Sequence, residues 1–378
     1  MFKHSNILLS LAFALLSIGP VAAQNTVPPL PGTPVPIVDS APQWSALFKR
    51  SSGWYGGDGI FTIPMGSGKT LFYFSDTMIG DSIGGKARST MIHNSFAVLQ
   101  GRVPSKDKIQ FYWDTSHTGG PQTPFIPKTP STQAGDYYWL GAGFFNPVKK
   151  ATYIFAYKMR NLDPHDDWSF TLTHTNMIVI PAGSTPPFRD HRQIETPLSF
   201  QGASPDEKGT FGAGIFTDPD GYVYVYGIKG KAKSLLVARV RADSVEDFSG
   251  WRFWDGAAWN KDMQRSAAVT DGVSDELSLS PLPDGRYILV FQQNGMSPVI
   301  SMRTGATPWG PFGAPTKLWE CTEGRENKHY FTYNAKAHPL LSAPGELLIS
   351  YNVNSFDFFK EIQKNPNLYR PRFIRLKL

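Results

Sequence analysis

The chain of 378 residues has few charges and many turn-forming and aromatic residues. Asp, Glu, Lys and Arg make up 18% of it, Phe, Trp and Tyr make up 13%, and there are 35 Gly and 31 Pro. Ordinary globular proteins carry about 25% charged residues. This composition excludes coiled coils, helical solenoids and disordered chains, and it favours a turn-rich, all-β protein. The hydrophobic fraction of 41% is ample for a large core.

The net charge of +6 comes from scattered basic residues. Nucleic-acid-binding proteins usually concentrate basic residues in a stripe or carry a known module, so we expect no nucleic-acid partner. Cys321 is the single cysteine. It allows no intrachain disulfide and no cysteine-ligated metal cluster, so packing must hold the fold together.

The first 23 residues have the pattern of an export signal. Lys3 precedes an almost wholly apolar run over 7–18, and Val21-Ala22-Ala23 offers small residues for cleavage. The run is shorter than the roughly 20 residues that span a bilayer, although a transmembrane anchor is the alternative. We therefore expect a secreted or periplasmic protein with no stable membrane anchor. The proline-rich segment 24–42 predicts a linker or surface strap, followed by one domain over 43–378.

Five segments share one pattern: a short strand rich in small residues, a tight turn, and a second, apolar strand. Such segments predict hairpins. Further strands are expected at 93–100, 177–180, 235–240 and 299–303. Five units of this kind predict a five-bladed β-propeller. A β-sandwich is the alternative, but its strands should alternate polar and apolar residues. The hairpins are expected at 57–74, 141–157, 212–226, 276–291 and 337–351.

Several of these segments resemble one known group. They are Gly57-Asp58-Gly59-Ile60-Phe61, Phe74-Ser75-Asp76-Thr77, His93-Asn94-Ser95 and Tyr333 to Pro339. They resemble exported bacterial five-bladed propellers of a former unknown-function family related to endo-D-arabinanases. More distantly, the chain is similar to the furanosidase propellers, which include arabinanases, xylosidases, invertases and levansucrases. The resemblance implies a polysaccharide or oligosaccharide substrate, no required cofactor, and a place near the axis where calcium could bind. Propellers bury their own sheet edges, so we expect a monomer.

Glycoside hydrolysis needs one carboxyl group to protonate the leaving oxygen and a second to attack or to activate water. Asp58 lies between two glycines in the first unit, and we predict that it is the nucleophile or base; a turn cap is the alternative. Glu276 occupies the corresponding place in the fourth unit. We predict that it is the general acid, because burial raises the pKa of a carboxyl group. A salt bridge, for example to Arg303, is the alternative.

The distant furanosidases carry a further acidic residue on the second blade, where this chain has Ala142. Asp76 or Asp136 could supply this third carboxylate, although an Asp at a strand end is often a backbone cap. Without it, a non-catalytic carbohydrate-binding or surface propeller becomes the alternative function. A lyase or transferase on the same scaffold is also open.

Aromatic residues cluster just before the predicted first strands. Flat rings stack on sugar rings, so Trp54, Tyr55, Tyr138 and Trp139 are predicted to bind substrate; packing between blades is the alternative. The resemblance adds His338 and His93 as pocket residues, with buried structural histidines as the alternative. Together the observations predict an exported glycoside hydrolase that acts on a furanose-containing polysaccharide, with D-arabinan as the first choice.

Overall fold

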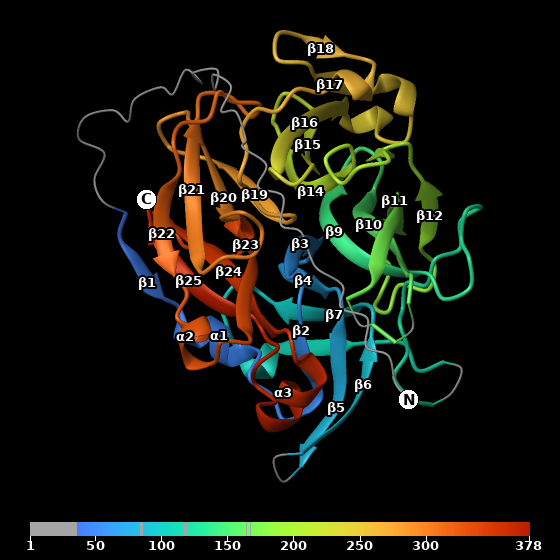
Figure 1. Ribbon diagram of the computed structural model, residues 1–378, viewed down its shortest axis with the longest axis vertical. Coiled ribbons are helices and arrows are strands. Elements are labelled where there is room, and N and C mark those ends of the chain that lie inside the picture. Colours follow the sequence, from blue (N-terminus) through green and yellow to red (C-terminus); the bar gives the residue numbers. More distant parts are fainter. Residues whose placement is uncertain (1–35, 84–85, 117–118, 164, 167) are drawn as a thin grey trace, which may run out of the picture.

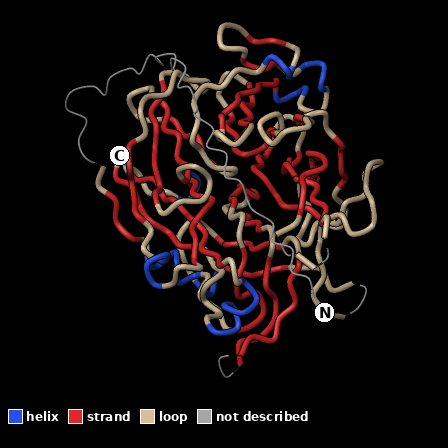
Figure 2. The backbone as a smooth tube through the Cα atoms, viewed as in Figure 1, coloured by secondary structure: helices blue, strands red, loops and turns tan. Residues whose placement is uncertain are grey.

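The computed structural model describes residues 36–83, 86–116, 119–163, 165–166 and 168–378. The expected signal peptide at 1–23 and most of the expected linker lie outside these ranges. The described chain is mostly β, with 48% strand and 10% helix, and Figure 2 shows strands throughout the body. Among the described helices, none is long and apolar enough to cross a membrane.

Five of the six sheets contain an antiparallel meander of consecutive or nearly consecutive strands. The first contains β3 (Phe61–Gly66), β4 (Lys69–Phe74), β7 (Ser95–Gln100) and β8 (Ile109–Tyr112). The second contains β9 (Tyr137–Asn146), β10 (Ala151–Asn161), β11 (Phe170–Pro181) and β12 (Arg192–Glu195). The third contains β13 (Ser199–Phe200), β14 (Gly209–Thr217), β15 (Tyr222–Lys229), β16 (Ser234–Arg241), β17 (Arg252–Trp254) and β18 (Trp259–Asn260).

The remaining two meanders follow the same order along the chain. The fourth sheet contains β19 (Leu277–Pro281), β20 (Tyr287–Gln292), β21 (Val299–Gly305) and β22 (Thr316–Glu320). The fifth contains β23 (Tyr330–Ala337), β24 (Glu346–Ser355), β25 (Arg372–Lys377) and β1 (Val38–Ser40). A sixth, three-stranded sheet, which the sequence did not predict, is formed by β2 (Ser52–Gly57), β5 (Thr77–Ile83) and β6 (Lys86–Ile92). The helices are α1 (Pro42–Leu47), α2 (Glu323–Glu326) and α3 (Phe358–Lys364).

One strand of each meander lies at the centre of the molecule; these central strands are β3, β9, β14, β19 and β23 (Figure 1). Strand β3 contacts β9, β9 contacts β14, β14 contacts β19, and β19 contacts β23. The 3-10 turn η5 (Pro339–Leu341), which follows β23, contacts β3 and completes the circle. This is a β-propeller-like arrangement, in which each sheet packs its apolar faces against its neighbours.

The two ends of the described chain meet in the fifth sheet. Val38 pairs with Leu376 and Ser40 pairs with Ile374, so β1 is the outer strand beside β25. Helix α1 follows at once and buries Trp44 and Leu47. Residues 38–42, which the sequence assigned to a linker or surface strap, therefore belong to the folded domain. The proline-rich sequence does not reveal this pairing, because the partner strand β25 lies at the other end of the chain.

The predicted hairpins of the second and third units lie within β9–β10 and β14–β15. Two first strands are displaced. Strand β3 starts at Phe61, where the predicted strand 57–61 ends, and β23 ends at Ala337, where the predicted strand 337–341 begins. The reason in the fifth unit is Pro339, which lacks an N–H for the sheet and instead starts the turn η5.

Small residues on the central strands allow these strands to approach closely. A Cβ at Gly141 would lie 2.8 Å from the carbonyl oxygen of Gly212, and a Cβ at Gly214 would lie 2.6 Å from Cδ1 of Leu277. Both distances are below any normal van der Waals contact. The small residues in these strands therefore allow the strands to pack closely around the axis.

We predict that Gly141→Ala lowers the free energy of unfolding by about 1–3 kcal/mol, because overpacking forces the backbone of β9 or β14 to move. Denaturant unfolding measures this change. The matched control is Gly313→Ala, where the new Cβ would meet its nearest atom, the Thr304 oxygen, at an ordinary 3.7 Å. Equal stability of the two variants would contradict close packing at the axis.

Candidate functional site

Two carboxyl groups lie where central strands begin. Asp58 precedes β3 by a short link, and Glu276 is the residue directly before β19. Both were predicted to lie on the strands themselves; they lie at the strand ends instead. The two side chains face β23 from either side: Tyr333 reaches Asp58, while Asn334 and Lys336 reach Glu276. One strand therefore links both acids.

The backbone holds Asp58 beside Asp76. The Asp58 N–H donates to the Asp76 carbonyl at 3.2 Å, and the Ser75 N–H donates to the Asp58 carbonyl at 2.9 Å. Gly59 has a φ of +60° in this link, a conformation that favours glycine. The link places the two carboxyl groups close enough for their charges to interact.

The Asp58 carboxyl group is unusually easy to protonate. Its Oδ2 accepts a hydrogen bond of 2.7 Å from the Tyr333 hydroxyl, and its buried Oδ1 has no hydrogen-bond partner among the described residues. Burial raises the pKa of Asp58 to about 8, and the negative charges of Asp76 and Glu276 add to the rise. The hydroxyls of Tyr333 and Tyr369 act in the opposite direction. At neutral pH, Asp58 therefore carries a proton.

Asp76 is held as an acceptor by two side chains. His93 Nδ1 lies 2.9 Å from Oδ1, and Trp139 Nε1 donates to Oδ2 at 3.0 Å. The His93 ring stacks on Tyr137 with a centroid distance of 4.0 Å. The Asp76 side chain retains 19% exposure. Of the predicted site residues, His93, Trp139 and Asp76 therefore meet next to Asp58.

Glu276 is buried with a cation as its partner. Lys336 makes an ion pair with Oε2, and Asn334 Nδ2 donates to Oε1 at 2.8 Å. Burial raises the pKa of Glu276, whereas the charge of Lys336 lowers it. The alternative that the sequence left open, a salt bridge, is therefore the observed state, but the partner is Lys336 and not Arg303. The Lys336 ammonium also lies 4.4 Å from the centre of the Phe61 ring.

A β-bulge explains how β23 serves both acids. The pairing of β23 with β24 shifts register between Tyr333 and Lys336, and Asn334 has a φ of 61°. Bulges redirect side chains and are common beside active sites. The sequence pattern of this segment predicted only His338 as a site residue. Tyr333, Asn334 and Lys336 were missed because a bulge cannot be read from strand periodicity.

The axis contains a cavity of about 130 Å³ lined by the central strands, including Thr62, Ala142, Ile215, Lys336 and His338. His338 is buried, with Nδ1 3.1 Å from the Thr62 hydroxyl and Nε2 2.7 Å from the Ser350 hydroxyl. Burial, together with the charge of Lys336, lowers the pKa of His338 to about 3. His338 is thus a neutral structural residue of the channel wall.

The residues near the axis do not fit the calcium ion whose binding there the resemblance implied. Both ring nitrogens of His338 have hydroxyl partners, and Lys336 places a positive charge nearby. Within the described residues, no group of three or more His, Cys, Asp or Glu side chains is arranged to hold a metal ion. We therefore derive no chemistry from a metal.

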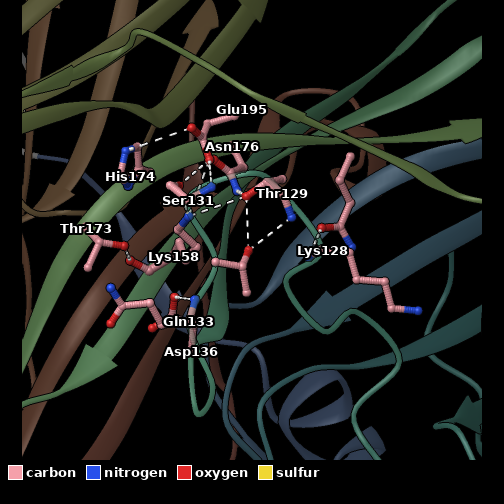
Figure 3. Close-up of polar contacts among 12 residues, drawn as sticks. Lys128, Thr129, Ser131, Gln133, Asp136, Lys158, Thr173, His174, Asn176 and Glu195 are labelled. Atoms are coloured by element: carbon pink, nitrogen blue, oxygen red, sulfur yellow. Dashed lines mark hydrogen bonds and ion pairs between the residues drawn. The ribbon is translucent and has the colours of Figure 1, made fainter.

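Asp136 does not supply the third carboxylate. Arg160 donates two hydrogen bonds to its carboxylate, from Nε to Oδ1 at 2.7 Å and from Nη2 to Oδ2 at 2.9 Å. Burial alone would raise the pKa of Asp136, but Arg160 and the Gln133 N–H hold it below its usual range. Figure 3 shows Asp136 near a separate polar cluster, in which the buried Lys158 contacts Ser131 and Glu195.

Three of the predicted stacking residues are core residues. Trp54 is 1% exposed and packs against Phe74 and Phe111, Tyr55 is 0% exposed, and Tyr138 is 0% exposed with its hydroxyl bonded to Gln193 and Asn176. No sugar ring can reach them, so the alternative of packing between sheets holds for these three. Trp54 and Tyr55 lie on β2 and Tyr138 lies on β9, and their side chains pack against neighbouring sheets. Sequence proximity to a glycine motif does not reveal this packing.

Residues 42–377 match a protein family described as a domain of unknown function, DUF5005. Among solved structures, a candidate hydrolase from Bacteroides ovatus is 20% identical, with a TM-score of 0.69 over 90% of each chain. This likeness shows a shared fold. An endo-arabinase from Bacteroides thetaiotaomicron is 11% identical, with a TM-score of 0.46 over 87% of this chain and 97% of that one. A GH43_1 enzyme from Xanthomonas citri is 13% identical, with a TM-score of 0.44 over 88% and 92%. No curated protein matches the chain.

We predict that Asp58→Asn becomes progressively more stable than the natural protein as pH rises from 4 to 8. In this window the folded protein must keep a proton on Asp58 that the unfolded chain has released, so the stability of the natural protein falls by at most about 1.4 kcal/mol per pH unit. The asparagine variant has no such requirement. Denaturant unfolding at several pH values measures the difference.

The control for this experiment is Asp107→Asn, at an exposed aspartate of the turn η1 (Lys106–Lys108). Its stability should follow that of the natural protein at every pH. If the free energy of unfolding of Asp58→Asn changes with pH just as that of the natural protein does, Asp58 is not protonated in the folded state.

Proposed function

The chain belongs to the DUF5005 family, and we propose that it is an exported glycoside hydrolase built as a five-bladed β-propeller. Its proposed substrate is a furanose-containing polysaccharide, with D-arabinan first. The observation that carries the proposal is the pair formed by Asp58, which holds a proton near neutral pH, and Asp76, which is held as an acceptor beside it. Hydrolysis of a glycosidic bond requires such a pair.

Asp58 fits the role of general acid. A carboxyl group with a pKa of about 8 is protonated at neutral pH and can transfer that proton to the leaving oxygen as the C–O bond breaks. Tyr333 donates to Oδ2, so the proton belongs on Oδ1. This reverses the role that the sequence favoured for Asp58, nucleophile or base, because the sequence does not reveal the burial and neighbouring charges that raise its pKa.

Asp76 fits the role of the second carboxylate. Trp139 donates to Oδ2 and His93 lies against Oδ1, which orients the group toward Asp58. It either attacks the anomeric carbon or takes a proton from the attacking water. In both cases the products are a new reducing end and a released sugar hydroxyl.

Glu276, the acid favoured by the sequence, fits a positioning role better. Burial raises the pKa of Glu276, but Lys336 and the Asn334 amide contact its oxygens and favour its ionised form. Its negative charge helps to raise the pKa of Asp58. Glu276 therefore acts on the reaction through Asp58.

The proposed location is outside the cytoplasm, either secreted or in the periplasm. The pattern at 1–23 supports export, and a polysaccharide too large to enter a cell has to be met outside it. The closed circle of sheets leaves no meander without packed neighbours, which supports a monomer.

A non-catalytic sugar-binding propeller is the second candidate. Two observations favour it: Ala142 occupies the place of a second-blade acid, and Oδ1 of Asp58 is buried. Binding without product release would distinguish this function from hydrolysis.

The test is a product screen of the exported protein against D-arabinan, L-arabinan, xylan, levan and galactofuranan. We expect reducing ends from one polymer. Asp58→Asn and Asp76→Asn should each lose at least about a hundredfold in rate, since each removes one partner of acid–base catalysis. Glu276→Gln should keep part of the activity.

Two results would contradict this assignment. No product from any polymer with the folded protein would favour the binding propeller. Full activity in Asp58→Asn, together with loss in Glu276→Gln, would restore Glu276 as the acid.

The pH dependence of kcat/KM tests the proton on Asp58 directly. The acid must be protonated to act, so we expect kcat/KM to fall tenfold per pH unit above about pH 8, the pKa of the buried group. Rates measured from pH 5 to pH 10 on the substrate found in the screen will show this limb. A basic limb near pH 5 would instead mean that the acid is an ordinary, solvated carboxyl group.

A further inference from the structure

Three aromatic rings form an exposed cluster, here called the aromatic platform: Trp168, Phe331 and Phe356. The Trp168 side chain is 45% exposed and that of Phe356 is 52% exposed. Ring centroids lie 4.6 Å apart for Phe331 and Phe356, 5.9 Å for Trp168 and Phe356, and 6.1 Å for Trp168 and Phe331. Large aromatic rings gathered at the surface mark a binding site more often than chance exposure.

The platform is connected to Asp58 through β23. Phe331 and Tyr333 are two residues apart, so their side chains project to the same face of the strand, with ring centroids 5.4 Å apart. The Tyr333 hydroxyl then donates to Asp58 at 2.7 Å. The platform therefore begins one ring away from the proposed acid.

A second route connects the platform to Asp76. Phe170, two residues after Trp168, meets the Trp139 ring edge to face at 4.8 Å. Trp139 in turn donates to Asp76 at 3.0 Å. Asp58 is thus joined to the cluster by rings in contact, and Asp76 is joined to it through Trp139, Phe170 and the short stretch of chain between Phe170 and Trp168.

The platform is assembled from two sheets that are not neighbours. Trp168 belongs to the connection between β10 and β11 in the second sheet, whereas Phe331 and Phe356 belong to the fifth. The first sheet, whose central strand follows Asp58, lies between them in the circle. The connection that carries Trp168 therefore meets the fifth sheet beside the carboxyl groups. The core does not need these partly exposed rings.

We propose that the aromatic platform is a sugar-binding subsite that holds units of a polysaccharide chain beyond the bond to be cleaved. Aromatic faces suit the C–H faces of sugar rings, and the His329–Asp357 ion pair next to Phe356, at 3.1 Å, offers polar groups for sugar hydroxyls. The inference rests on the proposed function and narrows it: the substrate is a polymer bound along several units, not a single terminal sugar.

The test compares binding and hydrolysis in the full mature chain. Binding to D-arabinan, L-arabinan, xylan, levan and galactofuranan is measured by affinity electrophoresis in an Asp58→Asn background, where no hydrolysis interferes. Trp168→Ala/Phe356→Ala should weaken binding of the recognised polymer about tenfold or more. In the protein that retains Asp58, kcat/KM for that polymer should fall similarly, while the rate on an aryl glycoside of the same single sugar stays unchanged.

The matched control is Phe145→Ala, at a partly exposed ring at the other end of β9. It should bind and hydrolyse like the natural protein. Circular dichroism and unfolding midpoints establish that each variant is folded.

The possible outcomes separate this inference from the proposed function. Loss of binding in the double variant without any hydrolysis by the natural protein supports the platform and overturns the hydrolase. Unchanged polymer binding and turnover in the folded double variant overturn the platform and leave the hydrolase in place. Binding of none of the polymers by the Asp58→Asn protein also overturns the platform.

Discussion

Close packing of the central strands is the constraint on which the rest of the structure depends. At Gly141 and Gly214 the neighbouring strand is so near that even a methyl group would collide with it. This approach brings the beginnings of strands from distant parts of the chain to one end of the axis. Asp58 and Tyr333, 275 positions apart in sequence, become hydrogen-bonded neighbours as a result. The pairing of β1 with β25 then ties the first and last parts of the circle together.

The same crowding buries two carboxyl groups, and the protein accommodates each in a different way. Glu276 stays beside a cation, Lys336, which offsets much of the cost of burying a charge. Among the described residues no cation pairs with Asp58, which is accommodated by keeping its proton. Protonation of one acid and compensation of the other are what make the two chemically distinct. A carboxyl group that holds its proton at neutral pH reduces stability, which is typical of sites where function outweighs stability.

The surroundings of the two acids also differ in how open they are to a ligand. Glu276 is buried against Lys336, which lines the narrow cavity of the axis, whereas Asp76, His93 and Trp139 keep part of their surface exposed. The proposed chemistry on a large substrate therefore fits the Asp58–Asp76 side of β23 better. The exposed rings of Trp168 and Phe356 contact Phe331, whose ring contacts Tyr333 beside Asp58. A polymer that lies across these rings would present one of its bonds to the carboxyl pair.

Much of the candidate site could be named from the sequence, but not how it works. The sequence pointed to Asp58, Asp76, Glu276 and Trp139, because acids and aromatic residues near the predicted hairpins are visible in it, and the family resemblance added His93. The sequence did not identify the residues that contact these side chains. Lys336 and Tyr333 act through a bulge in β23, and Trp54 and Tyr138 turn inward because neighbouring sheets cover them.

By itself the sequence determined the mostly β composition, the five repeated hairpins and the small residues that allow crowding at the axis. These features depend on local propensity and on turn chemistry, which a few neighbouring residues decide. Only the tertiary structure decided that residues 38–40 pair with β25, that Glu276 is paired with Lys336, and that Asp58 holds a proton near neutral pH. Strand partners, burial and charge neighbours come from residues far away in the chain, and a pKa depends on all of them at once.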